Sequence, residues 1–332
     1  MTQKFFISSL LVFSLVLSGC ASNSNVKPPQ EPLALLQLSQ KNMQGMMALS
    51  NDANFKIHFT GKSKDAKSSS FDLNLHVNMQ QDFVDPKSSS MLLEIDGSLD
   101  GVSSAVEKSP FPLSLAAQIF ANNSAAYIKV SSLQSKEELL PPESQKQLIG
   151  QWWQVPLPPG AFEQFVADIR VQQSVSQISA LSGQSLDFPD FFSDRKYLEK
   201  LDYEGVSSVK AGDSFRYTFS FGKVFFDALK IALSKGEKLS DTQIKDFEQV
   251  LSTATGSGEA FVSVDGNYLA KMVLNAAVPH FIDSEGSEGS VDFHFDVESY
   301  DFGKKPDFKV PSDAKVFDLA GFLGNFSAAM QQ

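Results

Sequence analysis

The sequence predicts an α+β fold in which one curved antiparallel sheet wraps around helices. Two observations carry this prediction. First, about ten segments alternate apolar and polar residues with a period of two, which is typical of strands that bury one face. The clearest are 70–80 and 214–222. Second, apolar helical segments precede, separate and follow these strands, so helices are available to cover the apolar side of the sheet.

The first half of the chain, 33–158, is expected to open with a helix and to continue as a series of strands. The helix spans 32–49, since a proline suits its first turn and apolar residues recur on one face. Asn51 and Asp52 are expected to end it. The expected strands are 54–62, 70–80, 91–99, 111–121 and 125–131.

The second half, 198–312, is expected to repeat this pattern loosely, after a helical insert at 161–194. Asp265-Gly266-Asn267 is the strongest hairpin turn in the chain. Pro311 is expected to end the sheet, and 33–330 is expected to form a single domain. The expected strands are 198–209, 214–222, 258–264, 268–278 and 290–302, and the expected helices are 161–181, 224–233, 241–251 and 316–330.

A short apolar stretch at the N-terminus leads to the only cysteine of the chain. Lys4 precedes an apolar run over 5–16, and Leu17-Ser18-Gly19-Cys20 follows, which is the anatomy of a secretory signal. The run is too short to span a bilayer stably. Leu17-Ser18-Gly19-Cys20 resembles the lipobox of bacterial lipoprotein signal peptides at every position.

The lipobox resemblance implies that the Cys20 thiol takes a diacylglyceryl group and that the chain is cut before this residue. Residues 1–19 are then the signal peptide and 20–32 a lipidated tether, so the mature protein is held on a membrane without spanning it. Ala21 is not the aspartate that retains many lipoproteins at the inner membrane. This favours the outer membrane or the cell surface, on the extracytoplasmic side. The alternative is an uncleaved anchor helix, or a plain secretory signal with a chance cysteine.

Composition excludes several classes of protein. A net charge of −11 disfavours nucleic acid and any wide electrostatic docking onto anionic lipid. Hydrophobic residues at 42% and charged residues at 20% are typical of a globular chain rather than a disordered one. Because the single cysteine is assigned to the lipid, the fold must hold without a disulfide. We expect a monomer.

Aromatic residues are mostly phenylalanine, with 29 Phe against 6 Tyr and 2 Trp. Phe supplies apolar area without a polar group, so it suits an apolar core or an apolar cavity better than a wet binding surface. Trp152 and Trp153 are the two tryptophans. Closing one end of a core is the favoured interpretation of this pair, and a platform for a ligand is the alternative.

Residues that carry chemistry are few. His58 and His76 lie on the polar faces of strands expected to pair, so a metal ion between them is conceivable, but a solvated strand face is favoured. The acidic run 283–288 lacks the ligand spacing of a calcium loop. No Gly-x-Ser-x-Gly motif occurs and no cysteine is free. We therefore expect no enzyme activity, no metal and no cofactor, and an extracytoplasmic hydrolase is the weakest alternative.

The mature chain resembles the bacterial lipid-carrier lipoproteins of the LppX/LprG type and, more distantly, the lipoprotein carrier LolA and receptor LolB. The resemblance rests on the lipobox, on a Leu- and Met-rich first helix, and on the segments 126–130, 150–156, 261–274 and 299–311. It implies an unclosed antiparallel half-barrel with helices on its concave face. It also implies a cavity between sheet and helices that takes acyl chains.

On this resemblance the ligand is a lipid or a lipoprotein, bound through its acyl chains and passed on without a covalent step. The alternative is a structural or sensory envelope lipoprotein whose core is packed solid and holds no ligand. The candidate cavity residues are apolar positions on one face of the expected strands: Phe55, Ile57, Phe59, Leu73, Leu75, Val77, Leu93, Ile95, Phe215, Tyr217, Phe219, Phe293 and Phe295.

Overall fold

The computed structural model describes most of the expected domain. The signal peptide, Cys20 and the tether up to position 30 lie outside the described residues, and so does the expected helix beyond position 317. The described residues are 31–43, 46–64, 68–103, 112–135, 146, 148–174, 192, 194–228, 245, 249–282 and 286–317.

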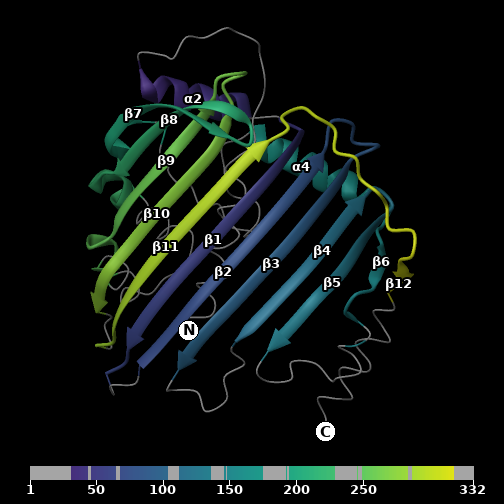
Figure 1. Cartoon of the computed structure of the whole chain (residues 1–332), viewed down its shortest axis with the longest axis horizontal. Coiled ribbons are helices and arrows are strands. Elements are labelled where there is room, and N and C mark those ends of the chain that lie inside the picture. The colour runs from purple at the N-terminus through teal and green to yellow at the C-terminus, as the bar shows by residue number, and fades with distance from the viewer. Residues whose placement is uncertain are drawn as a thin grey trace.

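Twelve strands of the described chain form one sheet, in the order β12-β6-β5-β4-β3-β2-β1-β11-β10-β9-β8-β7 (Figure 1). Neighbouring strands are antiparallel, except that β12 runs parallel to β6. The strands are β1 (Ala48–Lys62), β2 (Ser68–Asp82), β3 (Ser90–Ser103), β4 (Leu113–Asn122), β5 (Ala125–Ser135), β6 (Trp152–Pro156), β7 (Leu198–Val209), β8 (Gly212–Phe221), β9 (Thr255–Ser263), β10 (Leu269–Ile282), β11 (Glu288–Tyr300) and β12 (Lys315–Val316).

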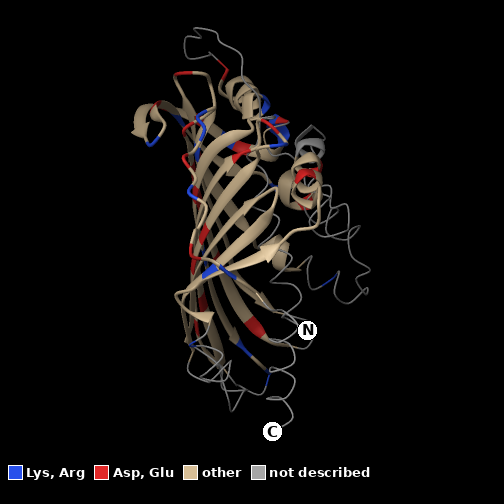
Figure 2. Ribbon diagram, turned by 90° about the vertical axis from the view of Figure 1, so that its right-hand side faces the viewer, with Lys and Arg blue, Asp and Glu red and all other residues tan. Residues whose placement is uncertain are grey.

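The sheet is curved and does not close, because β7 and β12 stand at opposite ends of the strand order. Seen from its side in Figure 2, it bends around the face on which the helices α2 (Pro32–Met43) and α4 (Ala161–Ser174) lie. The prediction of one large, curved and unclosed antiparallel sheet is confirmed.

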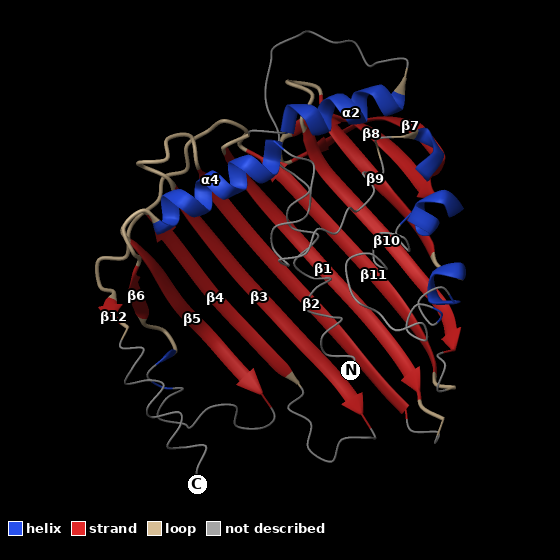
Figure 3. Cartoon of the chain, turned by 180° about the vertical axis from the view of Figure 1, so that it is seen from behind, coloured by secondary structure: helices blue, strands red, loops and turns tan. Residues whose placement is uncertain are grey.

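The two long helices lie across one end of the strands (Figures 1 and 3). From α2, Leu35, Leu36 and Met43 enter a buried apolar cluster with residues of the sheet. From α4, Phe162 and Val166 enter a second, smaller cluster. The expectation that helices cover the concave face is not confirmed. Besides α2 and α4, the helical residues 223–228 pack at the other end of β8, where Phe225 stacks on Phe221 with ring centroids 4.3 Å apart.

The first strand begins earlier than the sequence predicts. Asn51 and Asp52 do not end a helix, because β1 already begins at Ala48. Both residues are paired on both sides: Asn51, for example, lies opposite Met79 of β2 and Ser299 of β11. The neighbouring strands β2 and β11 satisfy the backbone hydrogen bonds of Asn51 and Asp52. This pairing outweighs the weak strand propensity of Asn and Asp.

The C-terminal part also differs from the prediction. Pro311 does not end the sheet, and Val316 begins no helix, because it belongs to β12 and pairs with β6. The next residue, Phe317, donates its backbone N–H to the carbonyl of Gln154 at 2.9 Å. Its ring meets that of Trp153 edge-on, with centroids 5.5 Å apart. An aromatic contact at the sheet edge thus favours an extended chain where sequence periodicity favours a helix.

The two tryptophans of β6 do not form a joint platform. Adjacent residues of a strand point to opposite faces, so Trp152 and Trp153 face apart. Trp152 packs against the cluster of Phe120 and Tyr127, whereas Trp153 meets Phe317. Each tryptophan ring therefore makes a different contact at this edge of the sheet.

The turn at 265–267 is confirmed and is held by α2. Gly266 and Asn267 have φ angles of +88° and +53°, which a tight hairpin needs and which Gly and Asn tolerate best. The side-chain amide of Asn42 donates to the carbonyl of Gly266 at 3.0 Å. The last turn of α2 is thereby fixed to the β9–β10 hairpin.

The edge strand β7 is irregular. Its register with β8 shifts between Leu198 and Lys200 and again between Tyr203 and Gly205, where Gly205 has a φ of +102°. Tyr203 and Val206 are largely exposed on it. These irregularities bend the strand and interrupt its ladder of backbone groups.

Close approach of aromatic rings to glycine sets the packing between the strands of the second half. Gly258 of β9 pairs with Phe219 of β8, and the Phe219 ring lies over the glycine. A Cβ atom added to Gly258 would stand 2.5 Å from Cζ of Phe219 and would also meet the carbonyl oxygen of Val273. Neither the ring nor the backbone has free space to move into.

Replacing Gly258 should therefore destabilise the fold. We expect Gly258→Ala to lower the free energy of unfolding by about 1–3 kcal/mol through overpacking. Ser257→Ala, on the exposed face of the same strand, is the control and should change it by less than about 0.5 kcal/mol. Equilibrium urea unfolding measures both, and equal midpoints for the two variants would contradict the packing described here.

Candidate ligand-binding face

The thirteen candidate cavity residues share one face of the sheet. Directly paired residues of antiparallel strands point to the same side, and the register joins these positions strand by strand. One row runs from Phe219 through Gly258 and Leu274 to Phe295 and Phe55. It continues through Leu75 and Gly97 to Leu115. This concave face carries α2 and α4, and nearly all its side chains are apolar.

The half of this face around β8 to β11 and β1 is closed by packing. We call this part the aromatic half; its aromatic rings come mainly from β8, β11 and β1. Their ring contacts include Phe55 edge-on to Phe293, with centroids 5.1 Å apart. Leu73, Leu75 and Phe293 pack against the rim of this cluster. Six candidates are no more than 7% exposed in the cluster with α2: Phe55, Ile57, Phe215, Tyr217, Phe219 and Phe295.

Burial in the aromatic half is deep enough to perturb a titratable group. It raises the pKa of the Tyr217 phenol to about 12, with a smaller contribution from Tyr203. The phenol is therefore neutral at any physiological pH. The aromatic half is therefore buried in the cluster that α2 joins.

The other half of the face, on β2 to β5, is aliphatic and stays partly exposed. We call it the aliphatic face. None of its large side chains is fully buried, and Leu115 is 37% exposed. Pairing across β2, β3, β4 and β5 makes it continuous, with one register shift against β5 between Ala116 and Ala117 of β4. Its members are Leu73, Leu75, Val77, Leu93, Ile95, Leu99, Leu113, Leu115, Ile119, Ile128, Val130 and Leu133.

Sequence reasoning found only part of the aliphatic face. Leu73, Leu75, Val77, Leu93 and Ile95 are among the candidates, but the residues of β4 and β5 are not. Their alternation is visible in the sequence over 113–119, and pairing with β3 places them on the same side. Phe59, the remaining candidate, stacks on Phe71 near the far end of β1, with centroids 4.9 Å apart.

The helix α4 bounds the aliphatic face at one end of the strands. Its Phe162 and Val166 are buried against Phe83 and Ala121, with the Phe83 and Phe162 ring centroids 6.2 Å apart. Glu163 accepts a hydrogen bond from the side-chain amide of Asn123 at 3.2 Å. The helix therefore lies over the ends of β4 and β5 and leaves the middle of these strands to other contacts.

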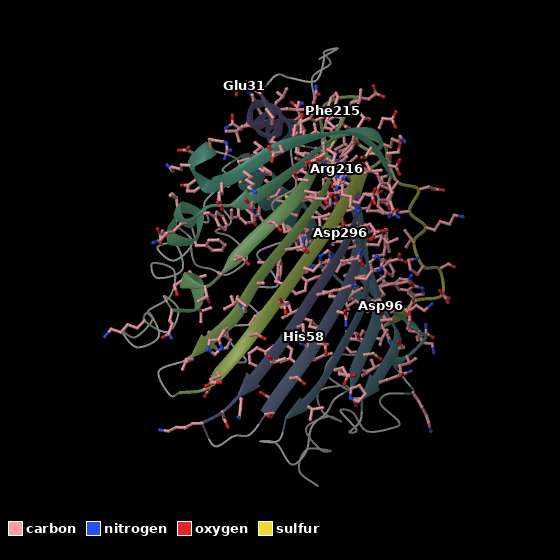
Figure 4. All side chains as sticks on the ribbon, turned by 60° about the vertical axis from the view of Figure 1, so that its left-hand side comes forward. Glu31, His58, Asp96, Phe215, Arg216 and Asp296 are labelled. Atoms are coloured by element: carbon pink, nitrogen blue, oxygen red, sulfur yellow. The ribbon has the colours of Figure 1, made fainter. Side chains whose placement is uncertain are left out.

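The opposite face of the sheet is polar. On β8, for example, Phe215 enters the core while Arg216 points outward and donates two hydrogen bonds to Glu259, at 3.0 and 2.9 Å (Figure 4). Residues of β8 to β11 and β1 line an open hollow of about 570 Å³ on this side, with Lys56, His58 and His294 among them.

The histidines of the polar face are each held by a neighbour. Nδ1 of His58 lies 2.7 Å from the carboxylate of Asp72, and Nε2 of His76 lies 2.7 Å from that of Asp52. His58 and His76 are thus turned to different carboxylates rather than to one metal ion. In the part of the chain that the structure describes, no three His, Cys, Asp or Glu side chains are arranged to hold one.

Asp52 ties the β7–β8 hairpin to the centre of the sheet. The Lys210 ammonium, at the tip of that hairpin, forms an ion pair with Asp52 and lies 5.0 Å from the ring centroid of Tyr300. Burial raises the pKa of Asp52, but the hydrogen bonds from Lys210 and His76 lower it more, so the pKa lies below its usual value of 3.8.

The Asp52 ion pair predicts a pH dependence of stability. A carboxyl group whose pKa is depressed by folding stabilises the fold above its unfolded pKa, and this is lost as the pH falls through the folded value. We expect Asp52→Asn to be less stable than the parent at neutral pH and to approach it below pH 3.8.

Urea unfolding over this pH range measures the effect. Asp96→Asn is the control, an exposed position on β3 of the same face (Figure 4). A constant difference between Asp52→Asn and the parent at every pH would show that the ion pair does not contribute.

No described helix has both the length and the apolar character needed to cross a membrane.

Comparison with known proteins places the chain in no family. No protein-family model matches it, and no curated protein matches it. Among solved structures, the lipoprotein LppX of Mycobacterium tuberculosis aligns over 83% of this chain and 97% of its own, at 11% identity and a TM-score of 0.27. A TM-score this low does not establish a shared fold. The resemblance to lipid-carrier lipoproteins therefore stays a prediction.

Proposed function

We propose that this protein is a lipoprotein, anchored through Cys20 on the extracytoplasmic side of a membrane, that holds an acyl chain of a lipid or lipoprotein against its aliphatic face. The single observation that carries the proposal is the aliphatic face itself: an apolar surface that continues across four paired strands and whose side chains stay partly exposed. Monomeric soluble proteins seldom expose such surfaces without using them.

The dimensions of the aliphatic face suit one chain. Along β3 it extends from Leu93 to Leu99, which is about 20 Å at 3.3 Å per residue. The hydrocarbon core of a bilayer is about 30 Å thick and contains two leaflets, so one acyl chain occupies about 15 Å. Each methylene moved from water onto apolar surface contributes about 0.8 kcal/mol. Release then requires only a partner that buries the chain better, and no covalent step or cofactor.

The second candidate is a structural or sensory envelope lipoprotein without a ligand. The aromatic half favours it, because Phe55, Tyr217 and Phe295 are buried there in one cluster. The two candidates differ in what the aliphatic face contacts in the native protein, and that difference is measurable.

Placing a charge on the aliphatic face should weaken lipid binding. We expect Ile95→Glu, in the middle of that face, to lower the affinity of residues 21–332 for a fluorescent fatty acid at least about tenfold, which corresponds to 1.4 kcal/mol. Ser98→Glu adds the same charge to the polar face of the same strand and should leave the affinity unchanged.

Mass spectrometry of lipid extracted from the purified parent provides the second measurement. Finding no lipid, together with equal fatty-acid affinity in both variants, would favour the structural or sensory candidate.

The anchor is tested separately. We expect the full chain to fractionate with membranes and its N-terminal peptide to carry diacylglyceryl on Cys20, and Cys20→Ser to lose both properties. Ser22→Ala, two residues into the tether, should retain them. Membrane attachment of Cys20→Ser would instead indicate an uncleaved anchor helix.

A further inference from the structure

One end of the sheet gathers both long helices and several turns. Because the strands are antiparallel, the loops 83–89, 123–124 and 264–268 and the hairpin tip 210–211 all lie at this end. Figures 1 and 3 show α2 and α4 along it. We call it the helical end, and the opposite end of the strands the far end.

The helical end exposes apolar side chains on a rigid base. Val84 is 63% exposed and Phe165 is 41% exposed. The Phe165 ring stands edge-on to that of Phe83, which is fully buried, with centroids 6.5 Å apart. Val84 follows Phe83 in the chain, and Phe165 packs against the Phe83 ring. One buried residue therefore supports both exposed side chains. Val264, at the β9–β10 turn, is a third, 39% exposed.

Exposed apolar side chains occur at the far end as well, for example Val102 at 71% exposed, so exposure alone does not choose between the ends. The tether does. Ten residues, and so eleven Cα–Cα steps, separate Cys20 from Glu31, which precedes α2 at the helical end (Figure 4). Fully extended, they span at most about 40 Å. The fifteen residues of β1 are about 50 Å long at 3.3 Å per residue.

These lengths restrict how the protein stands on its membrane. If the far end rested on the bilayer with the strands upright, Glu31 would stand about 50 Å above it, farther than the tether reaches. If the helical end rests on the bilayer instead, Glu31 lies close to the bilayer and the tether is long enough. The net charge of −11 further disfavours contact through electrostatic attraction to anionic lipid, so the contact has to be apolar.

We propose that the helical end docks on the bilayer that holds the Cys20 lipid, with Val84 and Phe165 entering the membrane interface. The proposal rests on the lipidation of Cys20 that is part of the proposed function. Docking in this orientation brings α4, and with it the end of the aliphatic face that α4 bounds, to the bilayer surface. An acyl chain would then leave the bilayer directly next to the face that receives it.

Spin labels on the full, lipidated chain test this orientation. Because the Cys20 sulfur carries the lipid, an introduced cysteine is the only free thiol. Val84→Cys and Phe165→Cys report on the helical end, and Val102→Cys is the matched control at the far end. Each labelled protein is incorporated into vesicles of phosphatidylethanolamine and phosphatidylglycerol. Collision with oxygen, which concentrates in the bilayer, is then compared with collision with a water-soluble nickel complex.

We expect the ratio of oxygen to nickel collisions at positions 84 and 165 to exceed that at 102 severalfold. Equal, water-like ratios at all three positions would overturn docking while leaving the anchor intact. A higher ratio at 102 alone would show that the far end faces the bilayer and would likewise overturn it. Failure of the full chain to float with the vesicles would instead refute the lipid anchor, so the two proposals fail in different measurements.

Discussion

The pairing of β1 with β11 is the constraint on which the rest of the structure depends. It joins the strands of the two chain halves into one sheet, in an unbroken register from Ser50 opposite Tyr300 to Lys62 opposite Glu288. A slip of one residue would turn every apolar side chain of one half toward water. Since Phe55 and Ile57 pair with apolar residues on both neighbours, burial of the core itself fixes the register. The concave face is continuous for this reason.

Side-chain size then divides that face into two parts with different properties. Phe and Tyr rings of β8 and β11 reach across to α2 and fill the space beneath it. The Leu, Ile and Val side chains of β2 to β5 are shorter, and the described helices reach them only at one end. The same strand pattern therefore produces a closed core on one side of β1 and a partly exposed apolar surface on the other. The proposed acyl-chain site lies on the second.

Much of this architecture is predictable from the sequence, because period-two alternation reports which face of a strand is apolar. It places Phe215, Tyr217 and Phe219 correctly on one side of β8. What it cannot report is depth of burial, which depends on what lies across the sheet, so these core residues look the same in the sequence as Leu93 and Ile95. The start of β1 and the strand β12 were missed because partners distant in sequence decide them. The position of the helices at one end of the strands has no sequence signal of its own.

The irregular edge at β7 has a consequence for self-association. An unclosed sheet leaves a row of backbone donors and acceptors that invites another strand, and repetition of that step leads to fibres. Two register shifts break the row, and Glu199, Lys200 and Asp202 place alternating charges along it. The sheet can therefore stay unclosed, with its apolar face accessible, and still resist repeated strand addition at its β7 edge.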